Sequence, residues 1–221
     1  MLSLNRKIPR ATWRTRDGNF SLHGLLGFHM YGKTAGIIGT GKIAKKLIMI
    51  LRGFGMNILA YDLYPDYNFA REHQVVYTTL DELYHSSDII SLHCPLTEQT
   101  KYLINDYSIS KMKDGVMIIN TGRGQLIHTN ALIEGLKNKK IGSAGLDVYE
   151  EESEYFYEDQ SDRIIDDDVL ARLLTFNNVI VTSHQAFFTR EALENIATTT
   201  LQNIKDFKSG KVSENEVKIQ N

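Results

Sequence analysis

Hydrophobic residues along the chain gather in short runs, and longer amphipathic stretches separate these runs. Each run is long enough for one buried strand but too short for a core helix. Because strands that alternate with helical segments indicate crossover units, the pattern predicts an α/β fold with a doubly wound parallel sheet. The predicted strands are Thr34–Ile38, Asn57–Tyr61, Val75–Tyr77, Ile89–His93, Val116–Asn120, Ser143–Asp147 and Val179–Thr182.

The stretch between the first two strands has helical periodicity, and Gly53 and Gly55 are expected to end that helix. Its polar side chains, such as Lys45, are assigned to the outer face. Further helices are predicted after Thr79 and Thr129, each of which can cap a helix. The apolar positions that we expect to face the sheet are Ile43, Leu47, Ile50, Leu51 and Phe54.

Both ends of the chain are also predicted to be helical. Residues 1–24 form a basic arm, because arginines and a lysine precede the first acidic residue, Asp17. This composition is compatible with a mitochondrial presequence or with a surface helix. Residues 187–221 contain a predicted amphipathic helix from Arg190 towards Phe207, followed by a frayed tail.

A glycine motif, GTGKIA at residues 39–44, follows the first predicted strand and opens the first helix. Gly39 permits a tight turn, Gly41 lets a phosphate approach the backbone, and Ala44 keeps the helix close to its strand. Asp62 follows the second strand, where a carboxylate can accept the ribose hydroxyls of NAD. The motif therefore predicts NAD binding, and the alternative is a tight turn without a ligand.

Composition agrees with this interpretation and excludes several classes. The 221 residues carry a formal net charge of −2, so there is no general attraction to nucleic acid. No apolar run approaches the length of about eighteen residues that a membrane span needs. The single cysteine, Cys94, excludes an intrachain disulfide and favours a cytoplasmic location.

Chemically useful residues also follow other predicted strands. His93, Arg123, Asp147 and His184 each lie at or just past a strand's carboxyl end, which is the edge where open parallel sheets bind ligands. The remaining histidines show no ligand spacing, and no metal site is predicted. The residues predicted to contact the cofactor are Gly39, Gly41, Lys42, Ile43, Asp62, His93, Cys94, Pro95, Thr121, Gly122 and Asp147.

Five segments carry a resemblance to a known family: GIIGTGKI, SLHCPLT, MIINTGRG, GLDVYEEE and SHQAF. With them the chain resembles the D-2-hydroxyacid dehydrogenases, most closely the fermentative D-lactate dehydrogenases, over nearly its whole length. The resemblance implies a Rossmann-type NAD-binding domain at residues 25–186. It also implies a homodimer in which the 1–24 arm takes part, and a 2-keto or 2-hydroxy acid as substrate.

The resemblance assigns catalytic roles to Arg123, Glu152 and His184. Arg123 corresponds to the arginine that binds the substrate carboxylate, a task that suits the guanidinium fork. His184 corresponds to the histidine that donates a proton to the carbonyl oxygen, and Glu152 to the acid that supports it.

Each role has an alternative when the residues are considered alone. Arg123 could be a surface residue, and His184 a histidine with only a structural contact. His93 is either structural or in contact with the cofactor. Glu152 stands beside Glu150 and Glu151, and only the resemblance selects it.

Members of this family normally begin with a substrate domain, which the chain is expected to lack. Residues 187–221 are then expected to belong with that domain. Two functions are compatible with the sequence. The first is an NAD-dependent oxidoreductase that interconverts pyruvate, or a similar 2-keto acid, and D-lactate, represented here by its cofactor-binding part. The second is a non-catalytic NAD-binding protein, either a degenerate fragment or a cofactor-sensing scaffold.

Overall fold

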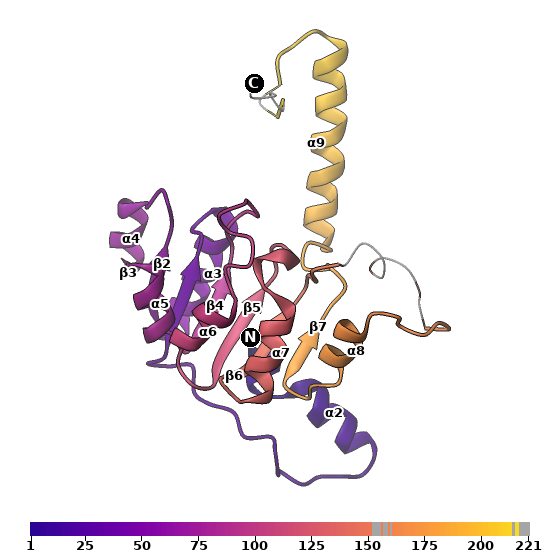
Figure 1. Cartoon of the computed structure of the whole chain (residues 1–221). Helices are drawn as coiled ribbons and strands as arrows, with labels where there is room; N and C mark the ends of the chain where they lie inside the picture. Colours follow the sequence, from indigo (N-terminus) through magenta and orange to yellow (C-terminus); the bar gives the residue numbers. More distant parts are fainter. Residues whose placement is uncertain (152–155, 157–158, 160, 214, 217–221) are drawn as a thin grey trace. The chain divides into compact units, whose positions relative to one another are not determined.

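The computed structural model describes residues 1–151, 156, 159, 161–213 and 215–216 (Figure 1). The chain divides into two compact units, Met1–His184 and Gln185–Asn221. The first unit contains a seven-stranded sheet in the order β3-β2-β1-β4-β5-β6-β7. All neighbouring strands are parallel. The order reverses between β1 and β4, so the predicted doubly wound Rossmann-type fold is confirmed.

The strands lie close to the positions that the hydrophobic runs predict. β1 (Thr34–Ile38), β2 (Asn57–Tyr61), β3 (Val75–Tyr77) and β5 (Val116–Asn120) match the prediction. β4 (Ile89–Leu92) and β7 (Val179–Val181) end one residue earlier, and β6 (Ile141–Leu146) begins two residues earlier. The central strands succeed as predictions because they are buried on both faces, and such strands are continuously apolar.

Helices cover both faces of the sheet. One apolar core contains residues of α5 (Leu80–Ser86), α6 (Asp106–Lys111), α7 (Thr129–Lys137) and α8 (Asp168–Leu174). The other contains residues of α1 (Leu2–Asn5), α3 (Lys42–Gly53) and α4 (Tyr67–His73). In Figure 1, α5 to α8 lie in front of the sheet and α3 lies behind it. A short 3-10 helix, η1 (Gly124–Leu126), follows β5.

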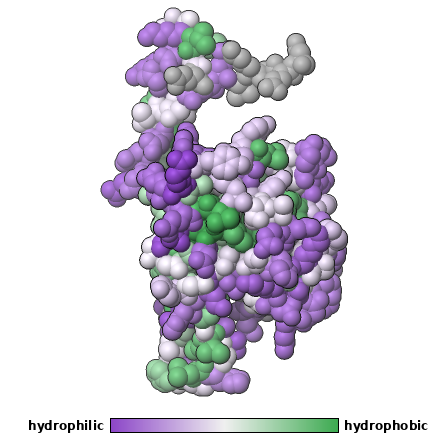
Figure 2. Space-filling model, turned by 90° about the vertical axis from the view of Figure 1, so that its left-hand side faces the viewer, coloured by the Kyte–Doolittle hydropathy of each residue, from purple (hydrophilic) through white to green (hydrophobic). Residues whose placement is uncertain are grey.

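The inner face of α3 agrees with the prediction at Leu51 and differs from it in other positions. The buried side chains are Ala44, Ile48 and Leu51, which recur at helical spacing along one stripe. Ile43 and Ile50, which we expected to face the sheet, are 75% and 58% exposed. The helix is apolar on more than one side, so periodicity alone could not select the buried stripe. Apolar side chains also gather in patches on the face shown in Figure 2.

The N-terminal arm contains two short helices, α1 and α2 (Ile8–Arg16), because Lys7 between them is left-handed, with φ of 51°. Leu4 is buried close to Gly145 of β6. The Asn5 side chain donates to the carbonyl oxygen of Phe28 and accepts from its N–H, both at 2.8 Å. The arm therefore packs on the sheet unit and holds the loop that leads to β1.

The second unit contains α9 (Arg190–Lys208), which agrees with the predicted C-terminal helix. The hydroxyl oxygen of Thr189 caps it by accepting from the N–H of Ala192 at 3.2 Å. Within the described residues, no helix is long and apolar enough to cross a membrane. The apolar side chains of α9 are exposed: Leu193, Ile196, Leu201, Ile204 and Phe207.

Candidate active site

The turn after β1 needs glycine at its first position. Gly39 has φ of 88°, a region that L-residues rarely adopt. A Cβ built on Gly39 would lie 2.6 Å from the backbone nitrogen of Cys94 and 2.7 Å from the carbonyl carbon of His93. The N–H of Gly39 donates to the carbonyl oxygen of Tyr61 at 2.8 Å. Gly39 therefore lets the ends of β1, β2 and β4 meet without a side chain between them.

Gly41, the second glycine of the motif, faces open space. It is the N-cap of α3 in an extended conformation, and a Cβ built on it would meet no atom within 4 Å. The helix has no side-chain cap and no acidic residue in its first turn. The first amides of α3, including those of Lys42 and Ile43, are thus available to an anion, and the helix dipole favours one there. An open glycine before an uncapped helix fits a dinucleotide pyrophosphate.

Asp62 lies just past β2, and the glycine turn fixes its carboxylate. The backbone N–H and the hydroxyl of Thr40 donate to Asp62 Oδ2 at 2.6 and 2.8 Å. The N–H of Tyr64 donates to Oδ1 at 2.8 Å. Burial opposes ionisation, but these hydrogen bonds outweigh it, and the pKa of Asp62 lies below its usual value. The group is therefore a fixed anion at neutral pH, as a ribose acceptor requires.

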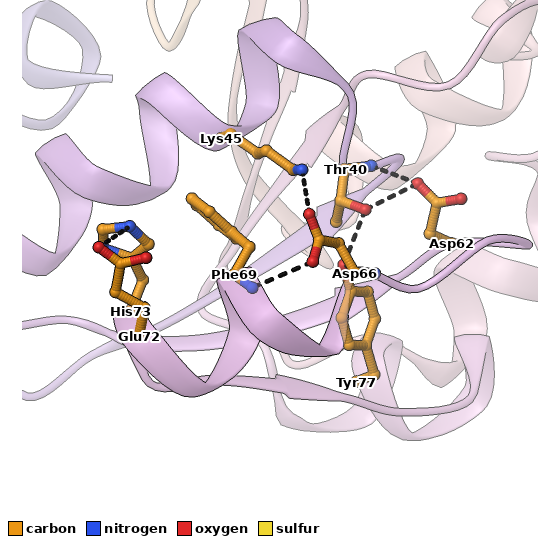
Figure 3. A network of polar contacts seen from close by, with 8 residues as sticks. All are labelled: Thr40, Lys45, Asp62, Asp66, Phe69, Glu72, His73 and Tyr77. Carbon is orange, nitrogen blue, oxygen red and sulfur yellow. Dashed lines mark hydrogen bonds and ion pairs between the residues drawn. The ribbon is translucent and has the colours of Figure 1, made fainter.

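A polar network extends from Asp62 to β3 and α4 (Figure 3). The hydroxyl of Tyr77 lies 2.9 Å from Thr40 Oγ1 and accepts from the N–H of Asp66 at 3.1 Å. Asp66 Oδ1 caps α4 by accepting from the N–H of Phe69, and Asp66 Oδ2 accepts from Lys45. Lys45, which we expected on the outer face of α3, is half-buried and ties that helix to α4.

The end of β4 lies directly beside the glycine turn. The N–H of His93 donates to the carbonyl oxygen of Ile38, and its Nε2 lies 2.9 Å from Ser91 Oγ. Burial lowers the pKa of His93 to about 4, so the ring is neutral at physiological pH. Burial also raises the pKa of the free Cys94 thiol. Pro95 follows, and its carbonyl oxygen accepts from the hydroxyl of Thr100 at 2.7 Å.

The loop after β5 is organised by Asn120, which is 1% exposed. Its Oδ1 accepts from the N–H of Gly122 at 3.0 Å, and its Nδ2 donates to the carbonyl oxygen of Arg123 at 2.9 Å. Thr121 and Arg123 are exposed at the edge of the sheet, and Arg123 Nη1 donates to the carbonyl oxygen of Gly122 at 2.8 Å. Because an added Cβ at Gly124 would lie 1.8 Å from the carbonyl oxygen of Tyr149, this loop packs directly on the loop after β6.

Asp147 and His184 follow the neighbouring strands β6 and β7. The N–H of Asp147 donates to the carbonyl oxygen of Asn120 at 2.9 Å, and the carbonyl oxygen of Asp147 accepts from the N–H of His184 at 2.7 Å. The hydroxyl of Thr182 donates to Asp147 Oδ1 at 2.5 Å. His184 is left-handed, with φ of 53°, and only partly exposed. These bonds place Arg123, Asp147 and His184 on successive strand ends.

The three glutamates after Tyr149 differ in what the structure shows of them. Glu150 accepts from the hydroxyl of Tyr102 and from the N–H and hydroxyl of Thr129, the latter at 2.8 Å. Thr129 therefore does not cap α7 as predicted; the N-cap is His128, and Thr129 is the first helical residue. Glu151 is exposed. Glu152, to which the resemblance gives the catalytic role, lies outside the described residues.

The structure brings the described candidates to one edge of the sheet, from Asp62 beside the glycine turn through His93 and Arg123 to His184. Among the described residues, no group of three histidine, cysteine, aspartate or glutamate side chains could hold a metal ion. Sequence reasoning missed the residues that orient the candidates. Thr40 and Asn120 could have been identified from their positions within motifs. Nothing in the sequence marked Tyr77, Tyr102 or Thr182 as orienting residues.

Comparison with known proteins agrees with this arrangement. Residues 1–186 match the family described as D-isomer specific 2-hydroxyacid dehydrogenase, NAD binding domain. The D-lactate dehydrogenase of Escherichia coli strain K12 is 55% identical over 217 residues, which are 98% of this chain and 66% of that protein. This chain thus spans just under two thirds of that relative.

Solved structures give the same result. The pyruvate reductase of Chlamydomonas reinhardtii has a TM-score of 0.92 and 44% identity, over 97% of this chain and 65% of that chain. The D-lactate dehydrogenase of Lactobacillus jensenii, solved with NAD+, has a TM-score of 0.87 and 32% identity, over 99% of this chain and 66% of that chain. From its sheet order, its glycine turn and these matches, we conclude that the chain belongs to the NAD-binding domain family of the D-isomer specific 2-hydroxyacid dehydrogenases.

Proposed function

We propose that the chain is the cofactor-binding part of an NAD-dependent dehydrogenase that interconverts pyruvate, or a similar 2-keto acid, and D-lactate. The observation that supports this most strongly is the edge of the sheet. The uncapped N-terminus of α3, which can bind an anion, and the fixed Asp62 carboxylate lie along this edge. Arg123 and His184 lie along the same edge, at the ends of other strands. Relatives named as D-lactate dehydrogenases make pyruvate and D-lactate the substrates to test first.

NADH would supply the hydride for reduction of the keto acid, and NAD⁺ would accept it in the reverse direction. The chain's residues would hold this cofactor at the edge of the sheet. The open backbone at Gly41 and the first amides of α3 would hold the pyrophosphate, and Asp62 would accept from the adenosine ribose. His93, Cys94, Pro95, Thr121, Gly122 and Asp147 are proposed to line the rest of the cofactor site. His93 presents a neutral ring there, which adds no charge beside the cofactor.

The substrate would lie beside the nicotinamide, between Arg123 and His184. The exposed Arg123 guanidinium can bind a carboxylate through two parallel hydrogen bonds. His184 as an imidazolium would give a proton to the carbonyl oxygen as it gains charge, and would take that proton back in the reverse direction. Glu152, beyond the described residues, is proposed to favour the imidazolium and to orient the ring.

Residues 1–24 are proposed to contribute to a homodimer. In this arm and the adjoining loop, Trp13, Phe20, Leu22 and Leu26 are at least 67% exposed, which is costly for a monomer in water. We further propose residues 25–186 as the cofactor domain and 187–221 as a segment that belongs with a substrate domain. A cytoplasmic location is proposed from the single free thiol, Cys94.

The direct test uses two forms of the protein. The chain itself should change NADH fluorescence on binding. The chain fused behind the part of the Escherichia coli relative that it does not match should also oxidise NADH when pyruvate is added. A chain that binds no NADH would refute the cofactor role, and a folded, NADH-binding fusion without 2-keto-acid reduction would refute the reaction.

A further inference from the structure

The polar network beside the glycine turn has only one possible direction of donation (Figure 3). Thr40 has one hydroxyl hydrogen and donates it to the ionised Asp62 carboxylate. The contact of 2.9 Å between Thr40 Oγ1 and the Tyr77 hydroxyl must therefore use the hydrogen of Tyr77. An N–H can only donate, so the Asp66 amide fills the acceptor side of Tyr77. Donation thus runs from Asp66 through Tyr77 and Thr40 to Asp62.

This direction decides which oxygen of Asp62 remains for a ligand. Oδ2 accepts both the N–H and the hydroxyl of Thr40, which fills its two acceptor positions. A ribose hydroxyl must then meet Oδ1, which already accepts from the N–H of Tyr64. The carboxylate is held in one rotational position, with Oδ2 towards Thr40.

Tyr77 is well placed to maintain that position. It is the last residue of β3, and its register partner on β2 is Ala60, two residues before Asp62. Its ring packs edge-on against Tyr67, with ring centroids 5.8 Å apart. In a chain of hydroxyl groups that ends on a carboxylate, each hydrogen bond polarises and strengthens the next. Without the Tyr77 hydroxyl, Thr40 Oγ1 would lose its donor and could rotate away from Asp62.

We propose that Tyr77 is a positioning residue for cofactor recognition: acting through the Thr40 hydroxyl, it holds Asp62 with one oxygen towards the adenosine ribose and so determines NAD over NADP selectivity. The inference rests on the proposed NAD site. A ribose 2′-hydroxyl can donate to the fixed oxygen, whereas a 2′-phosphate in its place would meet a carboxylate that cannot turn away.

The test is a double-mutant cycle measured by equilibrium binding of NADH and NADPH to the full chain. Tyr77→Phe keeps the ring and should weaken NADH binding by about fivefold, the size of one hydrogen bond. NADPH binding should change less, so that the NADH-to-NADPH affinity ratio falls by roughly threefold. In a Thr40→Val background, Tyr77→Phe should add less than about twofold, because coupled residues are not additive.

Tyr67→Phe is the matched control. It removes a phenol hydroxyl from the ring that packs on Tyr77, and no hydrogen bond of that hydroxyl occurs among the described residues. Both affinities should stay at the wild-type values. Thr40→Ser, which keeps a hydroxyl, should retain most of the NADH affinity that Thr40→Val loses.

Several results would overturn the proposal. Equal losses for NADH and NADPH in Tyr77→Phe would indicate a general structural role, and so would unfolding of that variant where Thr40→Val stays folded. Additive effects in the cycle would mean that Tyr77 does not act through Thr40. Wild-type affinity in Tyr77→Phe would remove Tyr77 from cofactor recognition while leaving the NAD site intact, whereas a wild-type chain that binds no NADH would refute the site itself.

Discussion

The backbone N–H of His184 donates to the carbonyl oxygen of Asp147 across 2.7 Å. This bond joins the chain just past β7 to the chain just past β6, and the Thr182 hydroxyl binds the Asp147 carboxylate beside it. The left-handed conformation of His184 is therefore supported from the neighbouring strand end. The candidate proton donor is thus positioned by main-chain bonds of the sheet edge.

The two glycines of the turn should respond differently to alanine. Gly39→Ala places a side chain at a positive φ, where its Cβ would collide with the backbone of Cys94. It should lower the free energy of unfolding by about 1–3 kcal/mol. Gly41→Ala meets open space and should cost no more than about 1 kcal/mol as a poorer N-cap. Its methyl group should nevertheless weaken NADH binding by roughly 10-fold or more, through lost bonds to phosphate.

Urea unfolding and NADH titration of the same two variants separate these effects. A Gly41→Ala chain with wild-type NADH affinity would show that the pyrophosphate does not approach this turn. A fully stable Gly39→Ala chain would contradict the steric argument at the first glycine.

The charge of Asp62 should select NAD. Asp62→Ala should weaken NADH binding and narrow the preference over NADPH by about tenfold, because a 2′-phosphate no longer meets a fixed anion. Asp66→Asn makes the same change in net charge four residues away and keeps a good helix cap, so its selectivity should match the wild type. Equal or tighter NADPH binding by the wild-type chain would contradict the prediction.

The two residues proposed to act on the substrate, His184 and Arg123, should affect different kinetic constants in the fused form described above. His184→Ala should lower kcat by roughly 10² to 10⁴ through loss of acid-base catalysis, with little change in NADH affinity. Arg123→Lys should mainly raise KM for pyruvate, because an ammonium cannot reproduce the guanidinium fork. Steady-state kinetics together with NADH titration give both quantities, and unchanged kinetics in both variants would exclude these residues from the reaction.

Glu150 should be a structural residue. Glu150→Ala leaves Tyr102 and Thr129 without their acceptor and should lower the free energy of unfolding by about 1–3 kcal/mol. Glu151→Ala, at the exposed neighbour, should change stability by less than about 0.5 kcal/mol. Urea denaturation of the two variants tests the difference, and equal stabilities would show that the Glu150 contacts contribute nothing.

His93 should contribute to the pH dependence of folding. Its pKa is about 4 in the folded chain and near the ordinary 6.5 once burial is lost. The unfolded state therefore binds a proton at higher pH than the folded state. The contribution of the neutral ring to the free energy of unfolding is complete above pH 6.5 and is lost as the pH falls towards 4.

His93→Gln should flatten the stability profile between pH 6.5 and 4 relative to that of the wild-type chain. Urea denaturation at several pH values gives the comparison. A His93 ring that titrates near pH 6.5 by NMR in the folded chain would contradict the assignment.

The sheet could be predicted because its central strands, β1, β4 and β5, are buried on both faces, and their hydrophobic runs show this directly. The helices were harder. α4, α6 and α8 carry few buried side chains each, so their periodicity was too weak to detect. The face assigned to α3 was right at Leu51 but wrong at Ile43 and Ile50, which are apolar but exposed, because local spacing does not reveal which side meets the sheet.

At the site, the residue types and their strand ends were predictable, but their supports were not. Asn120 brackets the Arg123 loop from two sides, and Tyr77 reaches Thr40 from a strand on the far side of β2. These contacts depend on tertiary neighbours that lie far apart in sequence. Glu150 and Glu151 are the same residue type side by side in the sequence. Only the contacts of Glu150 with Tyr102 and Thr129 distinguish them.

Because Gly124 lies so close to Tyr149, the loops after β5 and β6 are expected to move together. Any side chain at position 124 would act as a wedge between the two backbones. A displacement of the segment that begins with Tyr149 is therefore transmitted to the arginine next to Gly124 without an intervening side chain. If Arg123 binds the proposed substrate, a shift of its main chain on binding would pass through the same contact to the backbone of Tyr149.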